Sequence, residues 1–457
     1  MLTSITPLDG RYNDNVSELS EFVSEYALIK TRVEIEAKYL LTLSDARVIR
    51  RFTKKERDIL LNLENRITIS QAEKVKKLEK ETRHDVKAVE KILRTLLEHT
   101  SLKDVIEMIH FGLTSEDINN LSYRLMLRRA TQSVCIPALK RIVDNLVVKA
   151  DEYKSLPMLA RTHGQAAVPT TLGKELVIFA QRLHDQILIL EKANLTGKLN
   201  GAVGNYNALH FAYPKVNWIQ FSKKFTTSLG LVPNLFTTQI NPYDDVSAYF
   251  QTYQRINSIL IDLNQDMWRY ISDHWFVLEV KKNEVGSSTM PQKVNPIDFE
   301  NSEGNLGMAN SLLEFLASKL MISRLQRDLS DSTVIRNIGT VLGYSLIGYK
   351  STLRGLTRIK ANVDKIDSDL SADWAILTEG VQTLLRKFDI KNSYSLVKSL
   401  VRGKHIDKQS WNEWVLQLPI KKTEKEILTQ LTPQNYIGLA IQITKNAVKQ
   451  IKSKTRS

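Results

Sequence analysis

The clearest regular pattern of apolar positions in the chain lies between Asp244 and about Leu278. No Pro or Gly interrupts this stretch, and its apolar residues recur at the spacings of three and four that place side chains on one face of a helix. These positions are Val246, Tyr249, Phe250, Tyr253, Ile256, Leu260, Leu263, Met267, Tyr270 and Ile271. The pattern predicts one helix of roughly thirty residues, on the order of 45 Å long at about 1.5 Å per residue.

Similar periodic stretches run through residues 118–153, 171–195, 300–322 and 338–360. A helix of this length cannot bury its apolar stripe in a small globule, so it needs other long helices beside it. We therefore expect an all-α fold around a central bundle of long antiparallel helices that continues into other subunits.

Shorter elements are expected on either side of this bundle. A chain of 457 residues exceeds the roughly 250 to 300 at which a single hydrophobic core stops growing, so two or three domains are expected. The segment NVDKIDSDLSADW interrupts the periodic pattern from residue 362. We expect a helical amino-terminal domain at residues 1–110, the bundle at 111–361 and a helical carboxyl-terminal domain at 362–457.

The composition agrees with a soluble protein that is mostly helical. Apolar residues make up 42% of the chain and charged residues 25%, which are ordinary values for a globular protein. The chain has only 18 Gly and 11 Pro, fewer than the roughly 7% and 5% of average usage. Turns are therefore few and the elements long.

Cys135 is the only cysteine of the chain, which excludes an intramolecular disulfide and favours a reducing compartment. The first residues, MLTSITPLDGRYNDN, lack the basic region and the apolar run of a secretory signal. Nowhere do about 18 uncharged apolar residues follow one another, as a membrane-spanning helix requires. We expect a cytoplasmic protein with no membrane partner.

The net charge of +14 suggests a different partner, because a basic surface is typical of nucleic-acid binding. Lys and Arg are nevertheless scattered among acidic residues, as in AEKVKKLEKETRHDVKAVEKILR at 72–94, and only the tail KNAVKQIKSKTRS is purely basic. We interpret the charge as a solvated surface and expect no nucleic-acid partner.

Gly, Pro and small polar residues collect between the predicted helices, and the most informative of these segments is GSSTMPQKVNP at 286–296. Gly286 permits unusual dihedrals, and Ser287 and Ser288 supply two hydroxyls. Lys293 and Asn295 place a cation and an amide nearby. A lone Gly-Ser-Ser would indicate only a turn before a helix. The whole string resembles the signature of the superfamily of fumarase, aspartase, argininosuccinate lyase and adenylosuccinate lyase.

Six further segments narrow the resemblance to one family. They are HFGLTSEDINN (110–120), ARTHGQ (160–165), NGAVGNYNA (200–208), TTQINPYD (237–244), NPIDFENSEGN (295–305) and QRDLSDSTVIRN (326–337). All are similar to adenylosuccinate lyases, particularly their bacterial branch. The resemblance runs from DGRY at 9–12 past residue 345.

The resemblance implies an anti elimination that breaks a carbon–nitrogen bond of a succinyl-purine nucleotide and releases fumarate. The substrates would be adenylosuccinate, which gives AMP, and succinylaminoimidazole carboxamide ribonucleotide of purine nucleotide biosynthesis. The family forms homotetramers in which three subunits share each active site. The sequence contains neither a Walker A loop nor a dinucleotide fingerprint nor a metal-ligand spacing, so we expect no cofactor and no obligatory metal.

The positions that match the family imply which residues transfer protons in the reaction. Ser287 matches the catalytic base, and we expect Lys293 and backbone N–H groups to stabilise its alkoxide. His163 matches the general acid, a role that suits an imidazole because it titrates near neutrality. Glu300 resembles the carboxylate that orients this histidine. Without its Thr-His-Gly-Gln context, His163 would be interpreted as structural.

Substrate binding requires cations and hydrogen-bond donors, because two carboxylates and a phosphate bring a charge of about −4. The positions that match the family's binding residues are Arg11, Tyr12, Arg83, His84, Asp85, Thr114, Ser115, Gln239, Ser288, Val294, Asn295, Asn301, Arg327, Ser332, Thr333 and Arg336. Thr114 and Asp117 also fit a capping box, and a helix amino terminus is itself an anion site.

Some positions depart from the family pattern, namely Gln292, Arg83, Asn241 and Tyr243. Pro-Gln-Lys at 291–293 is similar to argininosuccinate lyase, so another fumarate-releasing lyase is the first alternative. A non-catalytic basic helical binding protein is the second.

Overall fold

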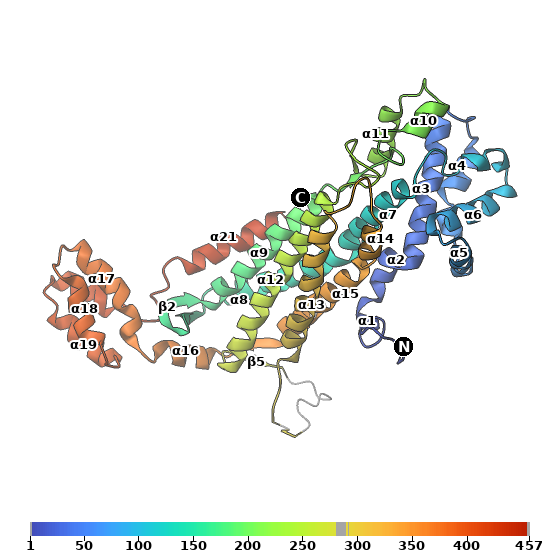
Figure 1. Ribbon diagram of the computed structural model, residues 1–457. Coiled ribbons are helices and arrows are strands. Elements are labelled where there is room, and N and C mark those ends of the chain that lie inside the picture. The colour runs from blue at the N-terminus through green and yellow to red at the C-terminus, as the bar shows by residue number, and fades with distance from the viewer. Residues whose placement is uncertain (1, 280–288, 291, 455–457) are drawn as a thin grey trace. The chain divides into compact units, whose positions relative to one another are not determined.

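The computed structural model describes residues 2–279, 289–290 and 292–454. The chain is helical over most of its length, which confirms the all-α fold (Figure 1). It divides into two compact units, each assembled from three stretches of sequence. The first comprises Met1–Ala138, Gln186–Ser258 and Gly304–Gly348, and the second comprises Leu139–Asp185, Ile259–Glu303 and Tyr349–Ser457. The division into three domains stays a prediction.

The long helices expected from the periodic stretches are present. They are α9 (Leu172–Lys192), α12 (Asp244–Ser272), α13 (Ile297–Lys319) and α15 (Ile338–Arg358). Residues 118–153 form α7 (Ser115–Ala130) and α8 (Ile136–Glu152), joined by the π-helical turn Thr131–Cys135. The turn is tied in place within the first unit, because the buried Thr131 hydroxyl lies 2.8 Å from that of Tyr253.

Helix α12 has 29 residues, close to the predicted length, but it ends before Leu278. His274 adopts a positive φ of 58°, which an α-helix does not accommodate. Residues Phe276–Leu278 then form β5, which pairs antiparallel with β6 (Ile359–Ala361). The apolar pattern continues through this segment because Phe276 of the strand is buried, as the apolar residues of the helix are.

The first unit contains the shorter helices of the amino-terminal stretch. They are α1 (Asn13–Val16), α2 (Ser20–Val23), α3 (Glu25–Asp45), α4 (Lys54–Leu61), α5 (Ile69–Thr82) and α6 (Asp85–Glu98), with 3-10 turns at Ser17–Leu19, Glu64–Arg66 and Lys103–Met108. Helix α3 packs on α7, and α5 on α6. The unit also contains α10 (Asn207–Ala212), α11 (Trp218–Ser228) and α14 (Ser330–Ile335), and β3 (Thr196–Gly197) pairs parallel with β4 (Val232–Pro233).

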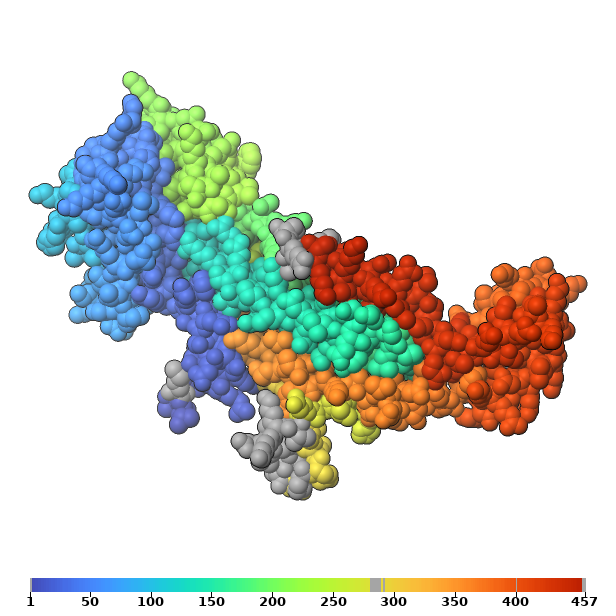
Figure 2. All heavy atoms as spheres, turned by 180° about the vertical axis from the view of Figure 1, so that it is seen from behind, coloured from blue at the N-terminus to red at the C-terminus, as the bar shows by residue number. Residues whose placement is uncertain are grey.

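The second unit contains an antiparallel hairpin, β1 (Pro157–Thr162) and β2 (Gln165–Thr171). Its carboxyl-terminal helices are α16 (Val363–Ser371), α17 (Thr378–Lys387), α18 (Ser393–Val401), α19 (Lys408–Gln417), α20 (Lys422–Thr429) and α21 (Ala440–Lys454), with a 3-10 turn at Trp374–Leu377. Trp411 and Leu385 belong to an apolar cluster of their own within this stretch. Helix α21, red in Figure 2, exposes Lys445, Lys449 and Lys452.

Buried polar side chains fix the long helices against one another inside each unit. In the second unit Asn264, Ser302 and Thr352 are fully buried and bond in a ring, with atoms 2.8 to 3.1 Å apart. In the first unit the Asn257 amide donates to the Ser345 hydroxyl at 3.2 Å. Because a slip of one helix would leave these groups unsatisfied, the contacts define the register.

Among the described residues, no helix combines the length and the apolar composition needed to cross a membrane.

Candidate active site

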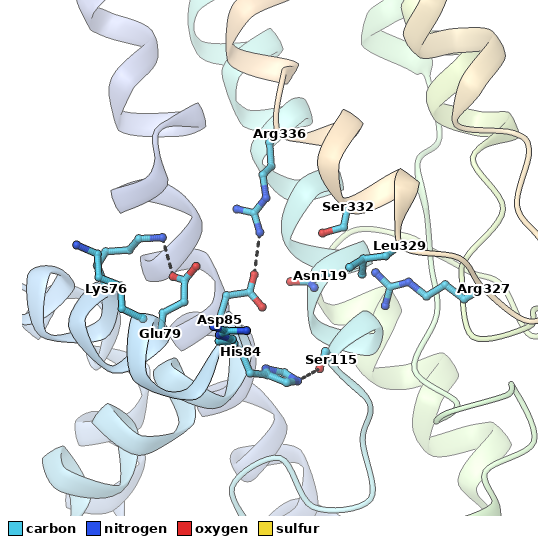
Figure 3. A pocket seen from close by; sticks show the side chains of 12 residues that line it. Lys76, Glu79, His84, Asp85, Ser115, Asn119, Arg327, Leu329, Ser332 and Arg336 are labelled. Atoms are coloured by element: carbon cyan, nitrogen blue, oxygen red, sulfur yellow. Dashed lines mark hydrogen bonds and ion pairs between the residues drawn. The ribbon is translucent and has the colours of Figure 1, made fainter.

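A cavity of about 600 Å³ in the first unit collects residues from three separate segments, 76–85, 115–119 and 327–336 (Figure 3). It is lined by Lys76, Glu79, Lys80, Arg83, His84, Asp85, Ser115, Asn119, Arg327, Leu329, Ser332 and Arg336. Seven of these were predicted to bind substrate: Arg83, His84, Asp85, Ser115, Arg327, Ser332 and Arg336. The structure thus brings together positions that lie far apart in the sequence.

Two helix amino termini open onto this cavity. Helix α6 begins after His84, whose Nδ1 accepts a hydrogen bond from the Lys87 N–H at 3.1 Å. Helix α7 begins after Thr114, whose N–H donates to the Asp117 carboxylate at 2.9 Å. The amino-terminal N–H groups of a helix favour anions, so both helices add to the positive charge of the arginines.

His84 connects the two helix starts. Since its Nδ1 accepts from a backbone N–H, the neutral ring carries its proton on Nε2. That nitrogen lies 3.2 Å from the Ser115 hydroxyl, to which it donates (Figure 3). The preceding residue, Arg83, ends α5 in the left-handed conformation with φ 50°, and its N–H donates to the Glu79 carbonyl at 2.7 Å.

Asp85 lies between two arginines. Its Oδ2 is 2.5 Å from Nη2 of Arg32 and 3.0 Å from Nη2 of Arg336. Burial alone would raise the pKa of Asp85, but the charge and hydrogen bond of Arg32, aided by Arg336, lower it to about 2. Arg32 is buried and also donates to Asn119 at 3.0 Å. Asp85 therefore holds Arg336 at the cavity as well as lining it.

Arg327 reaches the cavity from the loop before α14. Its guanidinium lies 3.4 Å from the amide oxygen of Gln239, a second predicted binding residue, and 3.3 Å from the Glu116 carboxylate. Glu116 is buried at the start of α7. The contacts of Arg327 join its own segment to those of Glu116 and Gln239, and Gln239 lies 88 positions before Arg327 in the sequence.

Buried Asp117, in the first turn of α7, connects the start of this helix to the loop that follows β3. Its carboxylate accepts from the N–H groups of Asn200 and Gly201 at 3.0 and 3.1 Å and lies 3.2 Å from the Lys198 ammonium. The loop that resembles the family at 200–208 thus fixes Thr114 and Ser115 in place, and the capping-box interpretation agrees with the contact between Thr114 and Asp117.

Other predicted binding residues lie outside the lining of this cavity. Arg11 and Thr333 are exposed, and Tyr12 is partly buried just before α1. In the second unit Asn301 accepts a hydrogen bond from the Ser351 hydroxyl at 2.8 Å. Val294 and Asn295 are partly buried before α13.

Of the four predicted catalytic residues, Ser287 lies outside the described residues, as does the binding residue Ser288. Lys293 is exposed, and its N–H donates to the Met290 carbonyl at 3.0 Å. His163 is exposed at the turn of the β1–β2 hairpin, with φ 54°.

Glu300 is exposed on the first turn of α13, as predicted, and its Oε1 accepts a hydrogen bond of 3.0 Å from the Trp268 indole. No hydrogen bond or ion pair joins Glu300 to His163, although both belong to the second unit. The single chain therefore does not form the predicted histidine–carboxylate pair.

Several residues that shape the site were not predicted from the sequence: Arg32, Glu116, Asn119 and Trp268. The sequence signal of Arg32 is its position one turn after Leu28, where a charged residue interrupts the apolar face of α3, but this signal does not identify its partners. The sequence around Trp268 gave no indication of a role in the site, because its partner Glu300 lies on another helix.

Two of the departures from the family pattern are explained by packing. Asn241 is fully buried, and its amide donates to the Thr196 hydroxyl at 3.0 Å while its oxygen accepts from Asn234 at 2.9 Å. The ring of Tyr243 lies under the Arg124 guanidinium, 5.0 Å from its centre. Both residues are parts of the packed interior beside Gln239.

Comparison with known proteins identifies the family. Residues 10–309 match a family model described as lyase, and residues 323–437 match one described as adenylosuccinate lyase C-terminal. The adenylosuccinate lyase of Escherichia coli K12 is 45% identical over 444 residues, which cover 96% of this chain and 97% of that protein. The chain belongs to the adenylosuccinate lyase family. The predicted resemblance is thereby confirmed.

A second member of the family is equally similar, and a more distant solved structure shares the fold. The adenylosuccinate lyase of Haemophilus influenzae is 44% identical over 446 residues, covering 97% of this chain and 98% of that protein. The 3-carboxy-cis,cis-muconate lactonizing enzyme from Pseudomonas putida shares the fold, with a TM-score of 0.75 and 17% identity over 97% of this chain and 99% of that one. Among the described residues, no group of three or more His, Cys, Asp or Glu could hold a metal ion.

Proposed function

We propose that the chain is a lyase that splits adenylosuccinate into AMP and fumarate and acts likewise on succinylaminoimidazole carboxamide ribonucleotide. The observation that carries this proposal is the 45% identity to the Escherichia coli adenylosuccinate lyase over 96% of the chain. The cavity supports it, because arginines and two helix amino termini are the groups that a substrate with one phosphate and two carboxylates requires.

In the proposed reaction Ser287 removes a proton from the carbon next to a carboxylate of the succinyl group. The electron pair of that bond forms the double bond of fumarate as the carbon–nitrogen bond breaks, and His163 protonates the departing nitrogen. Lys293 stabilises the negative charge that develops. No step needs an oxidant, a metal or a cofactor.

We propose that His163 meets Glu300 of another subunit in a homotetramer. Both side chains are exposed in the single chain and do not bond to each other, so each is available to a neighbouring copy. Helix α13 supports self-association, because Met308 and Phe315 are both exposed and lie seven positions apart on it. Apolar residues at this spacing form one stripe that favours packing against another helix.

A cytoplasmic location is part of the proposal. It is supported by Cys135, which is a free and buried thiol, as is usual for proteins of a reducing compartment.

The function is tested by offering the purified protein adenylosuccinate, succinylaminoimidazole carboxamide ribonucleotide and argininosuccinate in separate absorbance assays. We expect fumarate from the first two, with AMP formed in equal amount from adenylosuccinate. Turnover of argininosuccinate alone would replace this proposal with the first alternative. A folded protein that turns over none of the three would favour a binding protein.

A further inference from the structure

Two buried carboxylates in the first unit face a single guanidinium. Nη2 of Arg327 lies 3.3 Å from Oε2 of Glu116, and its Nε lies 3.6 Å from Oδ1 of Asp331. The arginine lines the cavity, whereas the side chains of Glu116 and Asp331 are only 2% and 4% exposed. Solvent therefore contributes little to balancing the two negative charges.

The carboxylate oxygens lack other partners. Oε1 of Glu116 and both oxygens of Asp331 accept no hydrogen bond. Such buried groups are costly when ionised, because the free energy of hydration is lost without replacement. The pair thus carries one charge more than Arg327 can compensate.

The neighbouring cations are already paired with other carboxylates. Lys198 lies 3.2 Å from Asp117, and Arg124 lies 2.9 Å from Asp245. Tyr243 is a further ionisable group beside them and is fully buried, and burial raises its pKa well above the ordinary value. Burial also raises the pKa of the neighbouring Tyr123. Both tyrosines stay neutral and cannot offset the excess negative charge.

Burial of the excess negative charge raises the pKa of Glu116. Burial raises its pKa to about 7, with Arg327 opposing and the charge of Asp331 adding to the rise. An anion from the substrate that takes over the Arg327 guanidinium removes much of the opposing effect. The protonated form of Glu116 is then favoured further.

We propose that binding of a substrate anion at Arg327 is coupled to uptake of one proton by the Glu116–Asp331 pair. Glu116 is a positioning residue here: neutralised, it releases Arg327 from one of its two internal counter-charges so that the guanidinium can serve the substrate. This inference rests on the proposed function, which supplies the anionic substrate.

The coupling predicts a direction for the pH dependence of binding. Below pH 7 Glu116 is already protonated in the empty site, so binding needs no further proton. Above pH 7 a proton must be taken up, and affinity falls by as much as about tenfold for each pH unit. The KM for adenylosuccinate should rise over this range while kcat changes less.

The test is calorimetric titration of the whole enzyme with AMP at pH 8 in buffers of different ionisation enthalpy. The phosphate of AMP, with its second pKa of about 6, is already a dianion at that pH and takes no part. Wild-type enzyme should take up about one proton per site. Glu116→Gln should take up none, because the neutral amide removes the carboxylate that would accept the proton.

Two variants complete the test. Asp331→Asn should also abolish proton uptake, which keeps the proposal testable if Glu116→Gln fails to fold. Glu90→Gln is the matched control, because Glu90 is buried but bound by Lys87 and Arg94, and it should keep the wild-type proton count. AMP binding by wild type without proton uptake, or equal uptake by Glu116→Gln and wild type, would overturn the coupling alone. Failure of wild type to bind AMP would overturn the proposed function as well.

Discussion

The indole N–H of Trp268 donates a hydrogen bond of 3.0 Å to Oε1 of Glu300. Trp268 lies on α12 and Glu300 on the first turn of α13, so the bond fixes the direction of the carboxylate that we propose to orient His163. A hydrogen bond to a charged group contributes about 1.5 to 3 kcal/mol. We expect part of this free energy to lower the activation barrier of the proton transfer by His163.

Trp268→Phe keeps the ring and removes the donor. We expect kcat to fall by roughly 5- to 30-fold with little change in KM, because about 1 to 2 kcal/mol of transition-state stabilisation is lost when Glu300 is no longer held in one orientation. Steady-state kinetics over pH 6 to 9 checks this, and the pH profile of kcat should change with the environment of His163. Wild-type kcat and pH profile in the variant would show that Trp268 serves only the packing of α12.

Asp85 should be among the most sensitive residues of the first unit. Asp85→Asn removes the anion beside Arg32, and a buried ion pair that loses one partner costs about 3 to 5 kcal/mol. Urea unfolding should show this loss at pH 7. Asp104→Asn is the control, because Asp104 bonds Arg50 at an exposed position, where an ion pair contributes only about 0 to 1 kcal/mol.

The same carboxylate should contribute to the acid sensitivity of the protein. Its folded-state pKa of about 2 lies below the unfolded value of about 3.9. Its stabilising contribution is therefore complete above pH 4 and is lost as the pH falls from 4 toward 2. Asp85→Asn should lack this part of the acid-induced loss, and an unchanged pH dependence of stability in the variant would contradict the contact with Arg32.

His84 has two tasks that a pair of variants can separate. His84→Asn supplies a good helix cap and should unfold like wild type, whereas His84→Ala should lose about 0.5 to 2 kcal/mol. Both variants remove the contact with Ser115, so both should raise the KM for adenylosuccinate. If only the alanine variant has a raised KM, the role of His84 is confined to capping α6.

Ser287 and His163 should be indispensable to turnover but not to folding. Ser287→Ala and His163→Ala should each lower kcat by about 10² to 10⁴. Mixing the two inactive variants under conditions where chains exchange should restore part of the activity, because some sites would then combine an intact serine with an intact histidine. Proven exchange without recovery would contradict a site shared between subunits.

The long helices could be predicted from the sequence because their apolar spacing is regular over many turns. The hairpin that carries His163 could not, because its two strands are short and their pairing depends on the turn at His163 and Gly164, both with positive φ. In the sequence, ARTHGQ at 160–165 was recognised only by its resemblance to the family. The end of α12 was placed too late for a related reason, since the apolar residues after His274 pack as a strand.

The candidate site was predictable to the extent that it resembles a family. Composition and periodicity gave no indication that Arg83, Ser115 and Arg336 would line one cavity, whereas the family motifs placed all three. Contacts that depend on how the helices pack could not be predicted from the sequence. Arg32 and Trp268 act through partners on other helices, and nothing in their local sequence names those partners.

The most direct test of the account is a crystal structure of His163→Ala with adenylosuccinate bound. The account predicts an occupied site in which Arg327 and Arg336 hold anionic groups of the substrate, and Ser287 and residue 163 flank the scissile carbon–nitrogen bond from different subunits. A nucleotide bound elsewhere, or a site in which these two positions lie apart in the assembled enzyme, would contradict it.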